Sequence, residues 1–381
     1  MSTVYEPWTD TEYATSYESE VDDALIADSL YNTDDDSRPA FVRPRPTRGR
    51  RAKPKAETRK KRTERKAAEA KATREKLAEE GLAATLAMPQ RKPLFKARPG
   101  AIGINWPITG WLVFLHLGAL AAPFFFSWQG LVLAVVLHWV TGGLGVCLGY
   151  HRLFTHGSFS TYRPVRWLLG LLGVLSGEGA VGDWVANHRK HHALSDKEGD
   201  PHSPHDGAFW SHALWIVPQM TQQDYESHTH RWAPDVARDR VLMWIGRLQL
   251  PLHFVFGIGL LAIGWACGGW VLGASLLAWG LFARLIFVLH STWLVNSASH
   301  MWGYTNYEAG DDSRNNWLVA LLTYGEGWHN NHHAYPRMAN HGHRWWEFDL
   351  TFRTIRLMQR LGLAWNVVDY KHKHHSQKQA A

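Results

Sequence analysis

A short motif near the C-terminus, Gly325-Glu-Gly-Trp-His-Asn-Asn-His-His333, carries three histidines at positions i, i+3 and i+4. Side chains with this spacing lie on one face of an α-helix, because the helix makes one turn in 3.6 residues. Three imidazoles on one face make a poor hydrophobic core but a good half of a metal site. The motif therefore predicts a metal centre whose other ligands come from elsewhere in the chain.

Further histidines supply the other half. The segment His188-Arg-Lys-His-His192 repeats the same spacing, and two more groups follow long apolar stretches. The candidate ligands are His151, His156, His188, His191, His192, His300, His329, His332 and His333. One ion takes roughly four to six ligands, so nine imidazoles suit two ions.

The residue types narrow the choice of metal. Imidazole binds iron, copper, zinc and nickel, and the histidine groups contain no cysteine, which argues against structural zinc and against an iron–sulfur cluster. Copper stays open on this reasoning. Iron is favoured because it joins oxygen chemistry to an unactivated C–H bond.

Two apolar stretches position these groups. The segments 104–150 and 248–283 contain no Lys, Arg, Asp or Glu. A helix that spans a bilayer needs about 20 apolar residues, so each stretch is long enough, or nearly so, to cross twice. The predicted membrane helices run over about 107–126, 131–150, 250–267 and 270–295.

The charges that flank these helices predict their orientation. Lys96, Arg98 and Arg152 flank the first helix pair, whereas the turn inside it is uncharged. The positive-inside rule then places both termini in the cytoplasm, in the plasma membrane of a bacterium or the endoplasmic reticulum of a eukaryote. We expect an all-α integral membrane protein with four transmembrane helices. A helical cytoplasmic cap, formed by 151–247 and 296–370, would hold the metal centre.

Polar tails flank this membrane domain, which we place at 99–370. Residues 1–98 are acidic up to Asp36 and strongly basic from Arg38 to Lys76. Such a composition buries too little apolar surface to offset chain entropy, so we predict disorder. The basic block is expected to lie on anionic lipid headgroups rather than to bind nucleic acid. The histidine-rich C-terminal tail, 371–381, is not predicted to bind the metal.

Residues from about 104 to 370 resemble the integral-membrane fatty acid desaturases, in particular the delta-9 branch of stearoyl-CoA desaturases and cyanobacterial and plant acyl-lipid enzymes. The resemblance is carried by Gly149-Tyr-His-Arg-Leu-Phe-Thr-His-Gly-Ser-Phe159, Asp183-Trp-Val-Ala-Asn-His-Arg-Lys-His-His192, Asp200-Pro-His-Ser-Pro204, Thr292-Trp-Leu-Val-Asn-Ser-Ala-Ser-His300 and the opening motif. It implies two iron ions, cycling between Fe2+ and Fe3+, held by the nine histidines, with Asn296 holding a water on one iron.

The resemblance also implies a bent tunnel for a fatty acyl chain. The tunnel residues would be Trp139, Gly143, Glu178, Trp184 and Thr292. Glu178 replaces the usual glutamine, so we predict a carboxyl that is neutral or paired, because an isolated buried carboxylate is costly. An Arg–Asp pair that contacts CoA in animal enzymes is here Ala186 and Asn187, so CoA recognition does not carry over.

The implied reaction uses O2 as co-substrate and leaves a cis double bond, most simply at the delta-9 position. No catalytic side chain beyond the iron ligands is implied, and the protein's task is to position one pair of carbons and exclude water. The ligand histidines need acceptors on their other ring nitrogen. The candidates are Asp196, Asp200, Asp311 and Glu326.

The expected partners are membrane lipids, an acyl chain carried on lipid, CoA or carrier protein, and an external electron donor. The sequence has no dinucleotide fingerprint, cysteine cluster or His-Pro-Gly-Gly signature, so the donor would be a ferredoxin or a cytochrome b5. An acidic donor would suit the basic cytoplasmic surface, to which we assign Arg163, Arg166, Arg189, Lys190 and Lys197.

Two other functions compete with the desaturase interpretation. A di-iron hydroxylase would share the metal ligands and differ in its tunnel. A membrane metal carrier would place its site near the bilayer midplane, whereas these histidines gather at one predicted boundary.

Overall fold

The computed structural model describes residue 98 and residues 100–369, and these are mostly helical with short strands. The α-helices are α3 (Trp106–Ala121), α4 (Trp128–His138), α5 (Arg163–Val174), α6 (Val181–Leu194), α7 (Ala208–His212), α8 (Gln222–Trp232), α9 (Pro234–Ala237), α10 (Arg240–Arg247), α11 (Gln249–Leu277), α12 (Arg284–Asn296), α13 (Ala298–Met301), α14 (Trp317–Leu322), α15 (His329–Ala334) and α16 (Leu350–Arg360). Two predictions, the disorder of the N-terminal tail and the role of the histidine-rich C-terminal tail, concern segments outside the described residues.

Shorter elements complete the chain. The 3₁₀- and π-helices are η1 (Ala122–Phe125), η2 (Trp139–Thr155), η3 (Pro204–Asp206), η4 (Leu214–Ile216) and η5 (Ala278–Ala283). Two antiparallel ladders form between sequence-distant strands. They pair β1 (Gly103–Ile104) with β3 (Pro218–Gln219) and β2 (Ser160–Thr161) with β4 (Ala364–Trp365).

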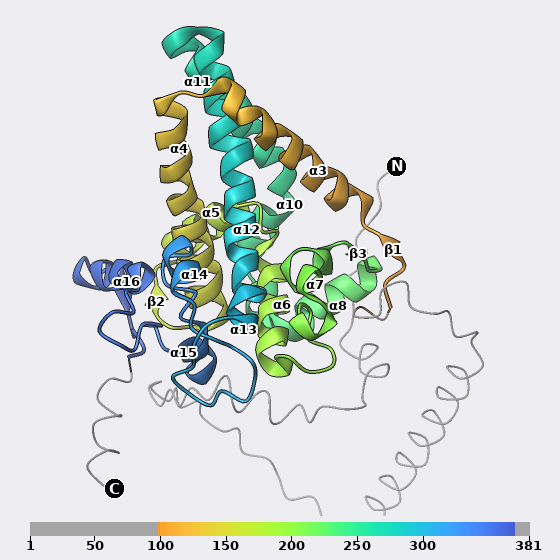
Figure 1. Cartoon of the computed structure of the whole chain (residues 1–381), viewed down its shortest axis with the longest axis vertical. Coiled ribbons are helices and arrows are strands. Elements are labelled where there is room, and N and C mark those ends of the chain that lie inside the picture. Colours follow the sequence, from red (N-terminus) through yellow and green to blue (C-terminus); the bar gives the residue numbers. More distant parts are fainter. Residues whose placement is uncertain (1–97, 99, 370–381) are drawn as a thin grey trace, which may run out of the picture. The chain divides into compact units, whose positions relative to one another are not determined.

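Three helical stretches are long and apolar enough to cross a membrane: Trp106–Phe125, Trp128–Thr155 and Gln249–Met301. The third doubles back on itself (Figure 1). Gly269 makes the turn with φ of 79°, a left-handed conformation that favours glycine. A Cβ added to Gly264 would lie 2.6 Å from Cα of Gly273, so the two arms of the hairpin pack closely. The turn lies between the predicted helices 250–267 and 270–295.

The second apolar stretch extends beyond its predicted end at Tyr150. Its second part is a π-helix from Trp139 to Thr155, which carries His151 and Arg152. π-Helical segments are rare and occur often at functional sites. A Cβ on Gly145 would lie 2.5 Å from the backbone N of Gly173, so η2 and α5 approach backbone to backbone. This contact holds α5, a helix too short to span a bilayer, against the core.

Two hydrophobic cores hold the fold together. One joins η2, α6, α10 and α16 through Leu148, Val185, Leu242 and Ile355. The other joins α3, α11, η5 and α12 through Leu115, Leu260, Leu281, Leu285 and Leu289. The first core includes residues of η2 and α6, which carry the candidate ligands His151, His188, His191 and His192, so it helps to position them.

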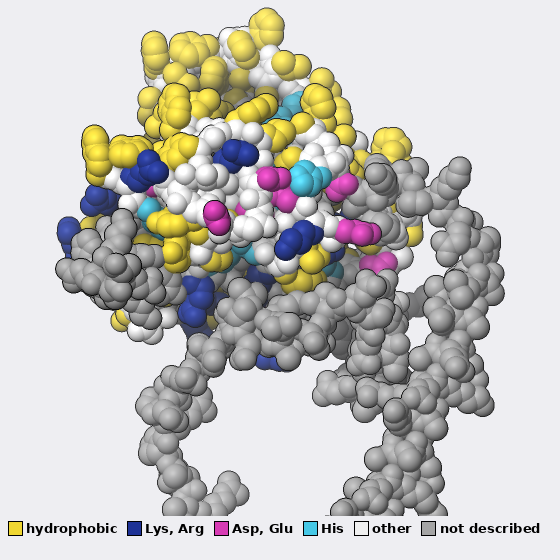
Figure 2. All heavy atoms as spheres, turned by 60° about the horizontal axis from the view of Figure 1, so that its bottom comes forward, with side chains coloured by type: hydrophobic (Ala, Val, Ile, Leu, Met, Phe, Trp, Pro, Cys, Tyr) yellow, Lys and Arg dark blue, Asp and Glu magenta, His cyan; other side chains and the backbone are white. Residues whose placement is uncertain are grey.

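The outward faces of α3, α4 and α11 expose large apolar side chains. Leu120, Val132 and Val255 are each more than half exposed. In Figure 2 hydrophobic side chains crowd the upper part, and charged side chains appear on the face below it. A continuous apolar surface of this kind suits lipid, so these helices fit a membrane protein.

The predicted exposure of one residue on the basic surface is wrong. Arg189 does not belong to an exposed basic surface, because its side chain is buried and donates to Asp235 at 2.6 Å and to the carbonyl of Phe154 at 2.7 Å. It ties α6 to η2 and to the start of α9. Arg163 and Lys197 are exposed, as predicted.

Candidate metal centre

All nine predicted histidines come together in two groups. Within each group, one ring nitrogen from each histidine lies within 4.8 Å of those of the others. The five-histidine cluster contains His151, His156, His188, His192 and His332. The four-histidine cluster contains His191, His300, His329 and His333.

Each of the two i, i+3, i+4 motifs contributes to both clusters, in opposite proportions. On α6, His188 and His192 enter the five-histidine cluster and His191 enters the other. On α15, His332 enters the five-histidine cluster, and its two partners in the motif enter the other. Residues at i and i+4 are nearly aligned on a helix, whereas a residue between them is rotated away. Two helices with the same spacing can therefore bridge two adjacent sites.

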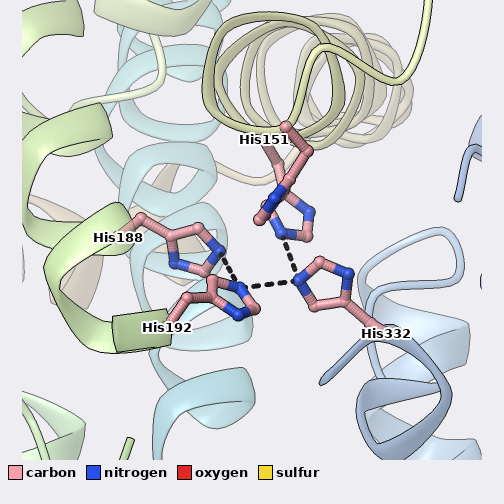
Figure 3. Close-up of side chains that lie close together, drawn as sticks. His151, His188, His192 and His332 are labelled. Carbon is pink, nitrogen blue, oxygen red and sulfur yellow. Dashed lines mark hydrogen bonds between the residues drawn. The ribbon is translucent and has the colours of Figure 1, made fainter. Parts of the chain in front are cut away.

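The five-histidine cluster is drawn together by short contacts between ring nitrogens (Figure 3). His332 Nε2 lies 3.0 Å from Nε2 of His151 and 2.8 Å from Nε2 of His192, and His192 lies 3.2 Å from Nε2 of His188. His156, directly after η2, completes the group, and its Nε2 is buried without a partner among the described residues.

Carboxylates orient the four-histidine cluster. The Nδ1–H of His300 donates to Asp196 at 2.8 Å, and Nδ1–H of His191 donates to Asp200 at 3.0 Å. His333 uses Nδ1 in the same way, donating to Asp311 at 2.5 Å. These hydrogen bonds fix the tautomer and leave a lone pair on each Nε2, directed into the cluster.

The lone pairs of this cluster give a test of whether a metal fits. Nε2 of His191 and Nε2 of His333 are buried and have no hydrogen-bond partner among the described residues. Nε2 of His300 faces Nε2 of His329 at 3.0 Å. Buried acceptors are normally satisfied, and a cation would satisfy converging lone pairs that have no donor. The donor set is all imidazole, which suits iron, and the residues fit the two-metal centre that the resemblance implies.

Burial keeps most of these imidazoles neutral, as metal ligands must be. Burial, reinforced by the neighbouring histidines, lowers the pKa of His188, His192 and His329 well below the usual range. His191 differs. Burial lowers its pKa, but the charge and hydrogen bond of Asp200, together with the charges of Asp196 and Asp311, outweigh burial and raise it.

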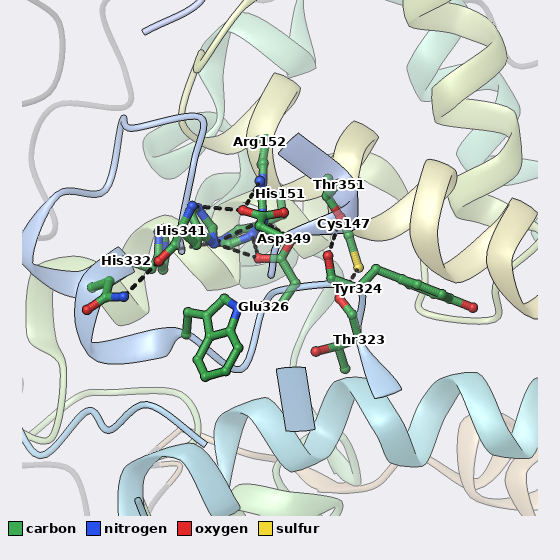
Figure 4. A network of polar contacts seen from close by, with 12 residues as sticks. Cys147, His151, Arg152, Thr323, Tyr324, Glu326, His332, His341, Asp349 and Thr351 are labelled. Atoms are coloured by element: carbon green, nitrogen blue, oxygen red, sulfur yellow. Dashed lines mark hydrogen bonds and ion pairs between the residues drawn. The ribbon is translucent and has the colours of Figure 1, made fainter. Parts of the chain in front are cut away.

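A buried network supports the five-histidine cluster (Figure 4). Glu326 accepts from Nδ1–H of His151 at 2.6 Å and from the guanidinium of Arg152 at 3.0 Å. Arg152 is fully buried and also donates to Asp349 at 2.8 Å. His341 lies 3.2 Å from both Glu326 and Arg152. Burial would raise the pKa of Glu326, but Arg152 and His151 hold it well below its usual value.

The sequence predicted all four carboxylates but missed their supporting network. Asp196, Asp200, Asp311 and Glu326 each contact a cluster histidine. Arg152, His341 and Asp349 were not predicted. Arg152 follows a candidate ligand directly, which was the only available signal, whereas the other two are isolated residues with no helical relation to a motif.

The predicted tunnel residues Glu178, Trp184 and Thr292 meet near the five-histidine cluster. The side chains of Trp184 and Thr292 both interact with the Glu178 carboxyl. Its Oε1 is shielded from solvent and has no hydrogen-bond partner among the described residues, although the residue as a whole is half-buried. Burial raises the pKa of Glu178 to about 8, which the two donors only partly offset. This pKa favours the neutral carboxyl, one of the two states, neutral or paired, that the sequence predicted. The Trp184 ring stacks on His188 with centroids 4.9 Å apart.

The other two tunnel residues lie together on η2, away from Glu178 along the chain. A Cβ on Gly143 would lie 2.9 Å from the Trp139 ring and 3.1 Å from the Tyr324 ring. Tyr324 was not predicted. Its hydroxyl bonds Nδ1 of His138 at 2.5 Å. Asn296 is the half-buried last residue of α12, and its predicted role as a water-mediated ligand remains a prediction.

Comparisons with known proteins identify the class. The profile of the fatty acid desaturase family matches residues 126–367. The chain is 45% identical over 270 residues to the sn-1 stearoyl-lipid 9-desaturase of Anabaena variabilis, which covers 69% of this chain and 94% of that protein. It is 44% identical over 267 residues to the sn-2 palmitoyl-lipid 9-desaturase of Nostoc sp. (strain 36), covering 70% and 90%. The icosanoyl-CoA 5-desaturase of Limnanthes douglasii is 36% identical over 257 residues, covering 67% and 70%.

The chain therefore belongs to the fatty acid desaturase family. It is an enzyme of lipid metabolism, an oxidoreductase that acts on fatty acyl chains. This finding supports the desaturase interpretation over the hydroxylase and metal-carrier alternatives.

Proposed function

We propose that this enzyme introduces a cis double bond at the delta-9 position of a saturated acyl chain held on a lipid. The observation that carries the proposal is the pair of buried histidine clusters beside the Glu178 carboxyl. The similarity to relatives named as acyl-lipid 9-desaturases supports the position and the carrier.

Each histidine cluster would hold one iron ion, with Asn296 reaching one of them through water. The iron pair, when bound, would supply the oxidising power of O2 for removing two hydrogens from neighbouring methylenes. The overall reaction consumes O2, two electrons and two protons and releases two waters. Glu326 and the three aspartates would keep the ligand lone pairs directed inward, so that the site is preorganised before the metal binds.

The protein's own task is to position the acyl chain. Trp184 stacks on a ligand histidine and also interacts with Glu178, so it links the metal centre to the proposed tunnel wall. A neutral Glu178 lets an apolar chain pass without facing a charge. Trp139, Gly143 and Thr292 would complete the tunnel, with the first two at its closed end.

We infer a membrane arrangement of four crossings with both termini in the cytoplasm. The hairpin turn at Gly269 divides the longest apolar stretch into two arms, which supports four crossings rather than three. The cap would comprise 151–247 and 296–370. Electrons would come from a ferredoxin or a cytochrome b5, because the sequence contains no cofactor motif that could supply them.

The direct test is expression in a host that lacks unsaturated fatty acids, followed by gas chromatography of each lipid class. We expect a new cis-9 monounsaturated acyl chain on glycerolipid. The matched His329→Ala variant should give none, because it removes a ligand from the four-histidine cluster. A hydroxy fatty acid without a new alkene would instead assign the enzyme to the hydroxylases.

A further inference from the structure

Away from the histidine clusters, α6 and α8 pack side by side (Figure 1). On α6, Asp183, Asn187 and Lys190 follow at i, i+4 and i+7, so they share one face. A Cβ on Gly182 would lie 3.0 Å from a Thr229 methyl carbon, so α8 packs closely against α6. Side chains on these facing surfaces are therefore near neighbours.

Three cationic side chains lie within electrostatic range of one imidazole near the contact between α6 and α8. Arg98 precedes β1, Lys190 lies on α6 and Arg231 lies on α8. The half-buried Lys190 side chain lies within electrostatic range of Arg98 and Arg231. His228 is also on α8, and the charges of all three cations act on its imidazole. We call Arg98, Lys190, His228 and Arg231 the α6–α8 basic cluster.

Negative charge compensates this cluster only in part. Asp183 lies within electrostatic range of Arg98, and its carboxyl also accepts from the Asn187 amide at 3.1 Å. Asp200 acts on Lys190 but is already engaged with His191 at 3.0 Å. Salt bridges among the described residues pair neither Lys190 nor Arg98 with a carboxylate. The cluster therefore keeps a surplus of positive charge in a partly desolvated place, where attraction for an anion is strong.

An unsatisfied imidazole lies within the same cluster. Nε2 of His228 is shielded from solvent and has no hydrogen-bond partner among the described residues. Burial lowers the pKa of His228 to about 3, so the ring is neutral and can donate one hydrogen bond. An arginine pair, a lysine and an imidazole donor form a set suited to phosphate, whose oxygens accept several charge-assisted hydrogen bonds.

The position of the cluster relates it to the acyl chain. Asp183 is directly followed by Trp184, which carries the proposed tunnel wall on the other face of α6. Arg98 precedes α3, the first apolar helix, so the cluster lies where the chain approaches the membrane. A headgroup bound at this place would sit at the edge of the bilayer, with its acyl chain directed toward the metal centre.

We propose that the α6–α8 basic cluster binds a phosphate of the group that carries the acyl chain. The proposal rests on the proposed function and deepens it, because it selects phosphate-bearing substrates over neutral glycolipids. The phosphate could belong to a glycerophospholipid or to the phosphopantetheine arm of a CoA or carrier-protein thioester. The shared chemistry is a phosphate on the group to which the acyl chain is joined by an ester or a thioester.

Native mass spectrometry of the iron-loaded full chain would test this proposal. The probes are distearoyl phosphatidylglycerol, stearoyl-CoA and distearoyl monogalactosyldiacylglycerol, which has no phosphate. The test variants are Arg231→Gln, on an exposed residue, and the double variant Lys190→Gln/Arg231→Gln. Arg238→Gln, an exposed arginine beyond α9, is the matched control.

We expect a phosphate-bearing probe to bind wild type more tightly than the galactolipid. Its affinity should fall about threefold in the single variant and about tenfold in the double variant, whereas Arg238→Gln matches wild type. KM should rise in parallel while kcat stays within about twofold, and the iron content should be unchanged. A loss confined to phosphatidylglycerol assigns the phosphate to membrane lipid, and a loss confined to stearoyl-CoA assigns it to a thioester.

Equal binding of galactolipid and both phosphate-bearing probes, unchanged in the variants, would overturn the proposal. Failure of the proposed function is a separate result, since it would give no alkene from any probe while binding remains measurable. Because Arg231 is exposed, its single variant keeps the test valid if the double variant folds poorly.

Discussion

The two histidine clusters use the same side chain in different electrostatic surroundings. In the four-histidine cluster, Asp196, Asp200 and Asp311 each accept from a ligand Nδ1–H. In the five-histidine cluster, Glu326 accepts a hydrogen bond from one histidine, His151. The buried Arg152 offsets the negative charge of Glu326. Carboxylate partners raise the basicity of a histidine ligand, so the four-histidine cluster should hold a dication more tightly.

We infer from this difference that the number of histidines alone would not determine the metal affinity of each cluster. The cluster with more histidines has fewer compensating charges, so its ion would stay more electron-poor and more easily lost. The shared helices α6 and α15 nevertheless connect the two clusters, because each contributes histidines to both. The following experiments separate the two clusters.

The largest effect is expected from His332→Ala. This ring contacts both His151 and His192, so its loss opens the five-histidine cluster. Iron measured by elemental analysis should fall from about two ions per chain to about one, with alkene formation below detection. His205→Ala is the control, since that histidine is largely exposed and bonds Asp312 outside both clusters. Full iron content in His332→Ala would remove this residue from the site.

The next experiment compares one carboxylate partner from each cluster. Asp311→Asn should lower iron affinity about 10- to 100-fold, measured by competition with a chelator. Glu326→Gln should do the same and also leave part of the Arg152 charge unpaired in the core, at a cost of about 3–5 kcal/mol in the free energy of unfolding.

Thermal unfolding of the iron-free protein distinguishes the two carboxylates. Glu326→Gln should melt well below wild type, and Asp311→Asn close to it, because Asp311 has no buried cationic partner among its described contacts. Equal melting temperatures would show that the Arg152–Glu326 pair contributes no more to stability than a single metal-orienting carboxylate.

A smaller effect on activity is expected when pH changes the ionisation of Glu178, which lies outside both clusters. The folded pKa of Glu178 is about 8, above its ordinary value of 4.5, so the carboxyl is neutral at neutral pH. The unfolded chain ionises first, so stability conferred by the neutral form falls as pH rises from about 4.5 to 8 and then levels. Activity should fall as pH rises through about 8 in wild type and stay flat in Glu178→Gln.

Iron content serves as the control for this pH experiment. It should not change between about pH 7 and pH 9, because Glu178 is not a member of either histidine cluster. A pH-dependent loss of iron with the same midpoint in Glu178→Gln would place the titrating group in the clusters instead.

The smallest effect is expected from Gly143→Ala. The added Cβ would meet the Trp139 ring at 2.9 Å and the Tyr324 ring at 3.1 Å, so it would narrow the proposed closed end of the tunnel. Competition between saturated chains should shift a few-fold toward shorter ones, with both metal sites intact. Gly259→Ala on α11 is the control, because its Cβ would enter open space. An unchanged chain-length profile in Gly143→Ala would place the tunnel end elsewhere.

The histidine pattern could be predicted from the sequence because helical spacing is a local property. Its division between two clusters could not, because that depends on how α6 and α15 are rotated against each other. The hairpin turn at Gly269 was predictable from paired glycines within an apolar run. The inward direction of Arg189 was not, since a charged residue beside lysine and histidine looks the same in sequence whether it is exposed or buried against Asp235.

The π-helix of η2 illustrates the same limit. Apolar composition predicted a helix that ends at Tyr150, but the wider helix continues to Thr155 and carries Arg152 into the core. The compensation that stabilises a buried arginine comes from Glu326 and Asp349, more than 170 residues later in the chain. Long-range pairing of this kind leaves no periodic signal in the sequence.

The most direct test of the unequal clusters is staged chelation of the iron-loaded enzyme, followed by Mössbauer spectroscopy and by counting the remaining iron. We predict two phases, with the first ion leaving the five-histidine cluster. Asp311→Asn should accelerate only the second phase, because Asp311 orients His333 in the four-histidine cluster. Loss of both ions in one phase, or acceleration of the first phase by Asp311→Asn, would contradict the account.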